Sequence, residues 1–285
     1  MKKKFLEVVL FFIGIMCLSY PILSNYINSY SKTEVIQHYV EDVENLSNDE
    51  KTNELVKAKE YNDNLNKDSG INISLDNEYN DNSEYGNYLN ILNIGNVLAY
   101  ISIPKINVYL PIYHGVSESV LQNGIGHMPE TSFPIGGKGT HCVLAGHTGL
   151  AKATMFDYID ELVLGDKFYI YVLDKVLEYE VDDIRVVEPS YQHAIDRNEN
   201  DDFITLVTCT PRYINSNRLL VRGKRVENSD AEKNFVSDDI MDNIKEDTIK
   251  KRKKLFNGIT VLFIIMLFGI AFLLKGKSKK GKHSN

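Results

Sequence analysis

Cys209 stands where a nucleophile would be useful. It follows the apolar run 203–208, which predicts a strand, and it precedes Thr210-Pro211, where proline blocks further strand pairing. A cysteine at a strand end beside a loop is placed for exposure, whereas free cysteines are more often buried in a core. A free thiol titrates near ~8.5, so a nucleophilic cysteine needs a neighbouring base or cation. Position alone leaves both interpretations of Cys209 open.

Two other residues could supply what a thiolate needs. His147 lies in Leu-Ala-Gly-His-Thr-Gly at a predicted strand end, where flanking glycines let another segment approach closely. Arg218 opens an alternating strand in which Leu220 has a core position, so Arg218 should turn inward and needs a partner or a task. A structural histidine and an ordinary salt bridge are the plain alternatives. The competing histidines are His114, His127, His141 and His193.

The combination of the three is more informative than each alone. Thr-Leu-Val-Thr-Cys at 205–209, with Arg218 nine residues later and Gly-His-Thr-Gly upstream, resembles the signature of the sortase family. Segments 101–106, 110–115, 126–137 and 218–223 resemble those of the pilus-type, class C sortases, and Tyr61-Asn62-Asp63-Asn64-Leu65 is similar to a short motif in that class's N-terminal helices. The resemblance covers roughly residues 55–227.

The resemblance implies a role for each residue. Cys209 would attack the Thr-Gly bond of an LPxTG-like sorting signal and form a thioacyl-enzyme. His147 would protonate the leaving amine and then act as base toward the incoming nucleophile. Arg218 would stabilise the oxyanion or orient the substrate. The residues expected to support the site or bind substrate are Gly146, Leu206 and Thr208.

The expected partners are LPxTG-like surface proteins or pilin subunits, together with an amine acceptor. The class C features favour a pilin lysine and therefore pilus polymerisation. The alternatives are a wall-anchoring sortase that uses a peptidoglycan-precursor amine, a cysteine hydrolase, and a non-catalytic surface-binding domain. No cofactor is expected, and no metal site either, because Cys and His do not stand at ligand spacings.

A lid over the site is a further expectation from the class. Class C sortases usually carry an Asp-Pro-aromatic motif in this lid, but no proline lies between residues 22 and 103 here. Asp76 and Tyr79 could take its place, the carboxylate meeting Arg218 and the ring covering Cys209.

The elements that must position these residues are short strands. Runs rich in β-branched and aromatic residues, bounded by Gly, Pro, Asn and Asp, occur at 98–103, 108–113, 140–145, 167–173, 176–187, 203–208 and 218–226. Seven or eight such strands with few helices predict an all-β barrel or sandwich. The resemblance implies a closed sortase-type barrel of about eight strands with short helices, as a catalytic domain over 98–227.

The sequence before the barrel predicts helices. Val35, Ile36, Tyr39, Val40 and Val43 recur at helical spacing, and 24–75 is expected to form an N-terminal helical region. Residues 76–97 are expected to form a lid-like loop, and 228–254 a linker.

Two apolar segments bracket the chain, at 5–23 and 255–274, and each is long enough for a transmembrane helix. An uncleaved anchor is favoured for the first over a signal peptide, because no small-residue cleavage site follows it. Basic residues place 1–4 and the tail 275–285 in the cytoplasm. The catalytic domain would then face the cell wall from outside. Lys250–Lys254 resist this assignment, so the orientation depends mainly on the first segment.

Composition excludes other functions. The net charge of -7, without a basic stripe, gives no reason to expect nucleic-acid binding. Three cysteines without a C-x-x-C pair exclude a zinc ribbon or a thioredoxin-like motif. Cys142, inside a predicted strand, is expected to be a small core residue, although a disulfide to Cys209 is the alternative.

Overall fold

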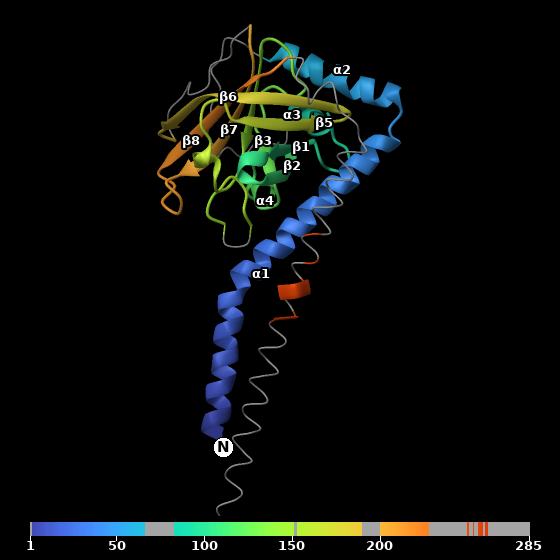
Figure 1. The fold of residues 1–285 in the computed structure, drawn as a ribbon. Helices are drawn as coiled ribbons and strands as arrows, with labels where there is room; N and C mark the ends of the chain where they lie inside the picture. The colour runs from blue at the N-terminus through green and yellow to red at the C-terminus, as the bar shows by residue number, and fades with distance from the viewer. Residues whose placement is uncertain are drawn as a thin grey trace, which may run out of the picture. The chain divides into compact units, whose positions relative to one another are not determined.

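Eight strands close into one barrel in the computed structural model, in the spatial order β1-β2-β3-β4-β7-β8-β6-β5 (Figure 1). Their bounds are β1 Ala99–Ile103, β2 Val108–His114, β3 Ile125–His127, β4 Thr140–Ala145, β5 Lys167–Val172, β6 Lys175–Val187, β7 Asp202–Thr210 and β8 Asn217–Arg225. The structure describes residues 2–65, 83–150, 153–189 and 200–227, with 250, 253, 256–258, 260 and 261. The predicted all-β barrel is therefore confirmed.

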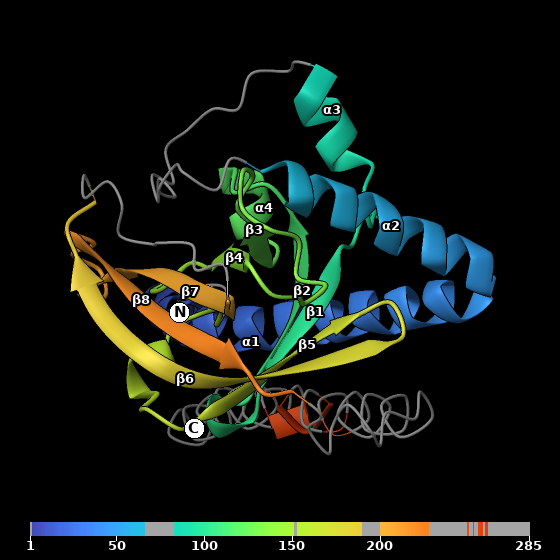
Figure 2. The ribbon, with the colours of Figure 1, turned by 90° about the horizontal axis from the view of Figure 1, so that it is seen from above.

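The strands agree with the sequence pattern to within one or two residues, except β3. In β5, exposed or half-buried residues alternate with the buried Phe168, Ile170 and Val172, as expected for a strand with one face on a core. Its partner β6 continues past β5 and pairs with β8, and these two run side by side (Figure 2). β7 is buried along most of its length because it lies between β4 and β8.

The short strand β3 has no alternation that the sequence could reveal, because it contains three residues. It pairs in parallel with β2 and antiparallel with β4. At Gly126 a Cβ atom would lie 2.3 Å from the carbonyl oxygen of Gly115, so only glycine allows this close approach.

Helices precede the strands along the chain or lie between them. They are α1 Lys2–Asn45, α2 Asn48–Asn64, α3 Ser83–Leu89 and α4 Glu118–Leu121, with 3-10 turns at η1 Pro104–Ile106 and η2 Ile159–Glu161. α1 up to Tyr30 belongs to a different compact unit from the barrel, whose unit begins at Ser31. Within the barrel's unit, the predicted amphipathic stripe is confirmed, since Ile36, Tyr39, Val40 and Val43 are all buried.

The α2 helix is fixed to the barrel's loops by polar contacts. Ser47 caps it through a reciprocal capping box with Glu50. Near its end, the buried Asn62 side chain accepts from the backbone N–H of Phe133 at 2.7 Å and donates to the Phe133 carbonyl at 3.1 Å. The Tyr61 hydroxyl also accepts from the backbone N–H of Glu130, at 3.1 Å. The motif at 61–65 therefore joins α2 to the segment after β3.

Two sequence expectations are changed or left without support. The expected loop at 76–97 contains helix α3, and its Tyr88 is 2% exposed. Burial of the Tyr88 ring stabilises helix α3, although the polar composition of residues 76–97 predicts a loop. The proposed lid residues Asp76 and Tyr79 lie outside the described residues.

The membrane spans receive no support from the structure. Residues 5–23 are helical within α1, but no helix among the described parts of the chain is both long and apolar enough to cross a bilayer. Of the second segment, 255–274, only 256–258, 260 and 261 are described, and most of the expected linker 228–254 also lies outside.

Candidate active site

The three residues singled out from the sequence come from adjacent strands at one end of the barrel. In the antiparallel pair β7/β8, Cys209 is directly opposite Arg218. The parallel pair β4/β7 ends with Ala145 opposite Val207, and Gly146 continues the register by donating its N–H to the Val207 carbonyl at 3.0 Å. His147 is the next residue, so it follows β4 at the same end of the barrel as Cys209. Strand register thus places Cys209 opposite Arg218, nine residues away in sequence, and brings the end of β4 to the same end of the barrel.

The cysteines differ in exposure. Cys209 is half-buried and Cys142 is 1% exposed, and neither forms a disulfide, so the alternative of a Cys142–Cys209 disulfide is not realised. Burial raises the pKa of the Cys142 thiol well above its ordinary value. Because the thiolate is the nucleophilic form, Cys142 is an inert core residue, as expected from its strand.

Arg218 is buried, as expected from the sequence, and is only 8% exposed, although β8 shows no alternation here because residues 218–221 are all buried. Its guanidinium makes two long hydrogen bonds, from Nη1 to the carbonyls of Asn215 at 3.3 Å and Asn217 at 3.4 Å. Its Nε is buried and has no hydrogen-bond partner among the described residues. The salt bridge considered from sequence is absent from the ion pairs of the described residues. A buried guanidinium nitrogen without a hydrogen-bond partner is rare in folded proteins and needs an explanation.

His147 is held on one side by a carboxylate that sequence reasoning missed. Its Nε2 lies 3.2 Å from Oε2 of Glu118, the first residue of α4. The other carboxylate oxygen, Oε1, accepts from the side-chain amide of Gln122 at 2.8 Å. The His147 side chain is 24% exposed and that of Glu118 67%, so the pair lies at the protein's surface. Ser117 is a recognisable helix cap in the sequence, but nothing local places Glu118 beside a histidine 29 residues away.

The competing histidines serve the structure where it describes them. His127 is fully buried between the Tyr88 hydroxyl, 2.9 Å from Nδ1, and the Ser132 carbonyl, 3.0 Å from Nε2, and burial lowers its pKa to about 3. Burial also lowers the pKa of His114, whose Nε2 meets the Ile91 carbonyl at 2.7 Å. The buried His141 contacts Thr205 Oγ1 at 2.8 Å. His193 lies outside the described residues.

The three neighbours expected to support the site or bind substrate are inside the protein. The Thr208 hydroxyl donates to the Gly146 carbonyl at 2.8 Å and ties β7 to the residue before His147. At Gly146 a Cβ would come within 2.6 Å of the Phe156 ring, so glycine is required for that packing. Leu206 is fully buried in the core. These placements fit a supporting role.

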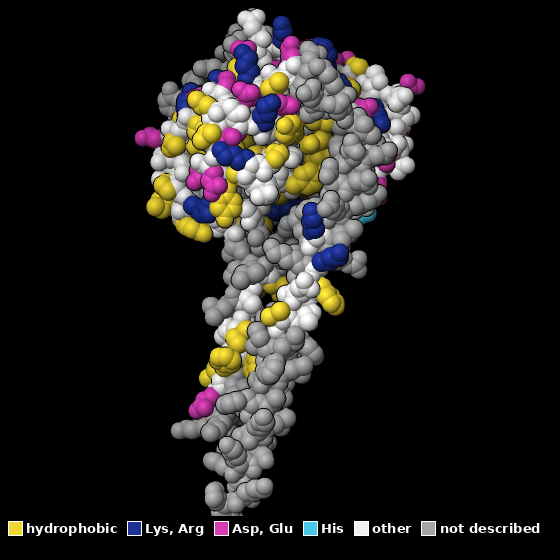
Figure 3. All heavy atoms as spheres, in the orientation of Figure 1, with side chains coloured by type: hydrophobic (Ala, Val, Ile, Leu, Met, Phe, Trp, Pro, Cys, Tyr) yellow, Lys and Arg dark blue, Asp and Glu magenta, His cyan; other side chains and the backbone are white. Residues whose placement is uncertain are grey.

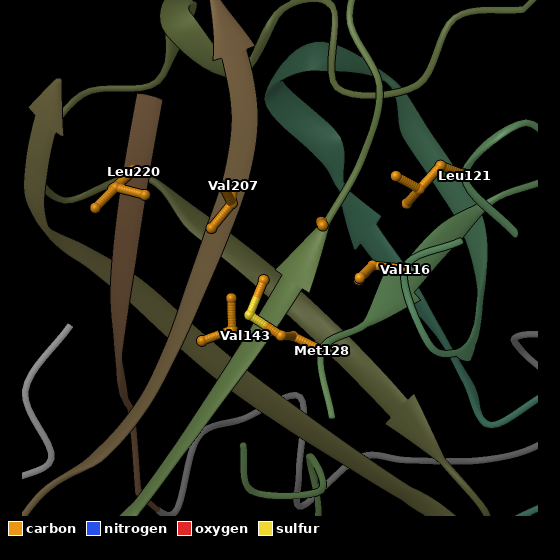
Figure 4. Close-up of a cluster of buried hydrophobic side chains, with 7 residues drawn as sticks. Val116, Leu121, Met128, Val143, Val207 and Leu220 are labelled. Carbon is orange, nitrogen blue, oxygen red and sulfur yellow. The ribbon is translucent and has the colours of Figure 1, made fainter. Parts of the chain in front are cut away.

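A compact apolar cluster lies beneath this end of the barrel and joins α4 to the strands (Figure 4). Its members come from the turn before α4, from α4 itself, from the residue after β3, and from β4, β7 and β8: Val116, Leu121, Met128, Val143, Ala145, Val207 and Leu220. Because protein interiors are close-packed, side chains anchored in one cluster keep fixed relative positions. Glu118 and the strand ends therefore share one rigid base.

Other functional sites find little support in the described residues. No group of three or more His, Cys, Asp or Glu side chains within them could hold a metal ion. The carboxylate of Asp182 is already engaged in a bidentate ion pair with Arg222, with both contacts at 2.9 Å. On the face drawn in Figure 3, basic and acidic side chains are intermixed over the barrel.

Comparisons with known proteins find relatives that share the barrel. The sequence model of the sortase domain matches residues 101–226. The crystal structure of sortase C-1 from Actinomyces oris is 45% identical, with a TM-score of 0.59, and the match covers 62% of this chain and 98% of that one. Sortase C of Streptococcus pneumoniae is 37% identical, with a TM-score of 0.62 and coverage of 68% and 96%.

Sortase A of Bacillus anthracis is 34% identical over 130 residues, which make up 46% of this chain and 60% of that protein. The chain thus spans less than two thirds of the length of this curated relative. The domain match extends over nearly the whole barrel, and the crystal structure of 45% identity is covered almost from end to end. The chain therefore belongs to the sortase family, and its solved relatives include class C sortases.

Proposed function

We propose that this protein is a cysteine transpeptidase that cleaves an LPxTG-like sorting signal between Thr and Gly and transfers the acyl group to an amine. Sortases are cysteine transpeptidases, and the family assignment supports this class of reaction. The observation that carries the proposal is the pairing of the half-buried Cys209 with the buried, incompletely bonded Arg218, beside the strand end that bears His147.

In the proposed reaction, the Cys209 thiolate attacks the carbonyl carbon of the signal's threonine. The oxyanion formed there accepts a hydrogen bond from the guanidinium of Arg218, the residue directly opposite Cys209 in the β7/β8 pair. Collapse of this intermediate breaks the Thr-Gly bond, and His147 gives its proton to the leaving glycine nitrogen. A thioester then joins the signal to Cys209.

The second half of the reaction runs in the opposite sense. An amine attacks the thioester carbonyl, His147 takes its proton, and the Cys209 sulfur leaves as the thiolate. The product is an amide, so neither an oxidant nor a cofactor is consumed.

We infer that the acceptor is a lysine of a pilin subunit. The likeness to sortase C structures supports this, and the published description of the Streptococcus pneumoniae enzyme speaks of pilin substrate specificity. The second candidate is a peptidoglycan-precursor amine, as in wall anchoring. A cysteine hydrolase would pass the same thioester to water, and a non-catalytic surface-binding domain would form no thioester at all.

One experiment separates these functions. The purified protein is incubated with an LPxTG-type peptide, with and without a lysine-containing acceptor peptide, and the products are identified by mass spectrometry. We expect an amide between the two peptides for the wild type and for Cys142→Ala, and none for Cys209→Ala. Free threonine-terminated peptide alone would indicate a hydrolase. Equal products from Cys209→Ala would refute the proposal.

We further infer from sequence that residues 5–23 and 255–274 anchor the protein in the membrane, with the barrel outside the cell. The support is their apolar character and the basic residues at 2–4 and 275–282. Recovery of the protein in the membrane pellet after alkaline extraction is expected. Its release into the supernatant would contradict two anchors.

A lid built from Asp76 and Tyr79 also stays a proposal. Another sortase structure, from Corynebacterium diphtheriae, is described as a lid mutant, which shows that the feature exists in a relative. Asp76→Ala is expected to speed labelling of the Cys209 thiol, and an unchanged labelling rate would count against this lid.

A further inference from the structure

We propose that Glu118 is a positioning residue that holds the His147 imidazole in its reactive orientation and tautomer. The inference rests on the proposed function, in which His147 moves protons in both half-reactions. It starts from the 3.2 Å contact between His147 Nε2 and Glu118 Oε2, and from the Gln122 amide that donates to the other carboxylate oxygen.

The chemistry of the pair fixes where the proton lies. An ionised carboxylate only accepts hydrogen bonds, so Nε2 of His147 must carry a hydrogen to bond with Glu118. In the neutral ring, the other nitrogen, Nδ1, is then the free acceptor that can take a proton from an amine. After it takes that proton the ring is cationic, and its bond to Glu118 becomes charge-assisted and stronger. Glu118 therefore favours one tautomer and stabilises the charge that forms during the reaction.

The carboxylate is itself held in place. Glu118 begins α4 and Gln122 is its C-cap, four residues later, so they lie on the same side of that turn and their side chains can meet. Both carboxylate oxygens thus have a partner, one each from Gln122 and His147. A side chain bonded at both oxygens samples fewer rotamers than a free surface glutamate.

The short helix that carries Glu118 is fixed to the core beneath the site. Ser117 caps it through the Val120 N–H, and Leu121, one turn after Glu118, is 4% exposed in the cluster shared with β4, β7 and β8. On the other side, the Gly115 N–H donates to the buried Tyr88 hydroxyl at 2.9 Å. Figure 4 shows Leu121 and Val116 facing the cluster that includes Val207 of β7. Supports of this kind are what a positioning residue needs.

The test compares Glu118→Ala and Glu118→Gln with wild type in the transpeptidation assay. Initial rates are measured over a range of acceptor concentrations and divided by the amount of folded enzyme, taken as the fraction in which the buried Cys142 thiol resists alkylation. Asn123→Ala is the matched control, because Asn123 ends the same turn but donates to the Ser119 carbonyl rather than to the site. Gln122→Ala removes the carboxylate's second partner.

We expect kcat to fall by about three- to tenfold in Glu118→Ala, the range for a charged hydrogen bond with one exposed partner, with the acceptor KM unchanged. Glu118→Gln keeps the shape and one hydrogen bond, so it should lie between Ala and wild type. Gln122→Ala should show a smaller fall in the same parameter, and Asn123→Ala none.

The proposal is overturned if kcat of Glu118→Ala stays within about twofold of wild type while Cys209→Ala is inactive. It is also overturned if only the acceptor KM rises, because Glu118 would then bind the acceptor instead of acting through His147. An equal fall in Asn123→Ala would show a general effect on α4. Undiminished transfer by Cys209→Ala would refute the proposed function as well, so the two failures are distinguishable.

Discussion

Replacing Arg218 by methionine should separate activity from stability at this site. Methionine keeps an unbranched apolar stem of similar reach but removes the guanidinium. Arg218 is 8% exposed, its two hydrogen bonds are long at 3.3 and 3.4 Å, and its Nε has no partner among the described residues. The side chain therefore contributes less to folding than a buried arginine with full hydrogen bonding would.

The magnitudes follow from these contacts. A buried donor without a partner costs about 1–3 kcal/mol, and the two weak bonds offset only part of this cost. We expect the free energy of unfolding of Arg218→Met to be unchanged or up to about 2 kcal/mol higher than that of wild type. Activity should move the other way, because loss of one donor to a developing oxyanion lowers kcat by about 100- to 1000-fold.

The control is Arg222→Met, four residues further along β8. Arg222 pairs with Asp182 through two 2.9 Å bonds and lies 4.3 Å from the Phe203 ring centroid. Both members of that ion pair are about a quarter exposed, at 26% and 29%, so its loss should cost about 1 kcal/mol. Activity per folded molecule should be unchanged.

Urea unfolding, followed by far-UV circular dichroism because the chain contains no tryptophan, gives the free energies of unfolding. The peptide transfer assay gives kcat. The reasoning is refuted if Arg218→Met is destabilised by as much as Arg222→Met, or if its activity falls no further than its folded fraction. Either result would make Arg218 a structural residue.

Three other predictions concern groups around the barrel. Asn62→Ala leaves the backbone N–H and carbonyl of Phe133 without their partner and should lower the free energy of unfolding by about 2–4 kcal/mol. The control Asn64→Ala removes an exposed side chain and should change it little; equal effects of the two substitutions in urea unfolding would contradict a stabilising role for the Asn62–Phe133 hydrogen bonds. The folded-state pKa of His127 is about 3, below the ~6.5 of an unfolded chain. Between these two pH values the unfolded state binds one more proton than the folded state, so the free energy of unfolding decreases as the pH is lowered, by up to about 1.4 kcal/mol per pH unit. His127→Gln should reduce that slope, measured by unfolding between pH 7 and 5, and an identical slope would argue against it. Iodoacetamide should modify Cys209 in the folded protein and Cys142 only after unfolding, because Cys142 is buried. Alkylation is located by peptide mapping, and modification of Cys142 before Cys209 would show that Cys142 is not an inert core residue.

Part of this molecule could be predicted from local pattern. The alternation in β5 shows which of its side chains face the core, whereas in β8 the expected burial of Arg218 is found without alternation, because residues 218–221 are all buried. Helical spacing identified the buried stripe at Ile36 and Tyr39. These features follow from the periods of two residues for a strand and 3.6 for a helix, which every short window of sequence carries. Where no period was available, as in the three residues of β3, the prediction failed.

The sequence by itself determined the candidate nucleophile, Cys209, and the strand end on which it stands. Only the tertiary structure decided which groups surround that site. The register of β7 with β8 places Arg218 directly opposite Cys209, and the pairing of β7 with β4 places Cys209 next to the strand that leads into His147. Packing of Leu121 in the core brings Glu118 to His147. These approaches depend on chain segments far apart in sequence, and no local propensity records which distant segment will pack against which.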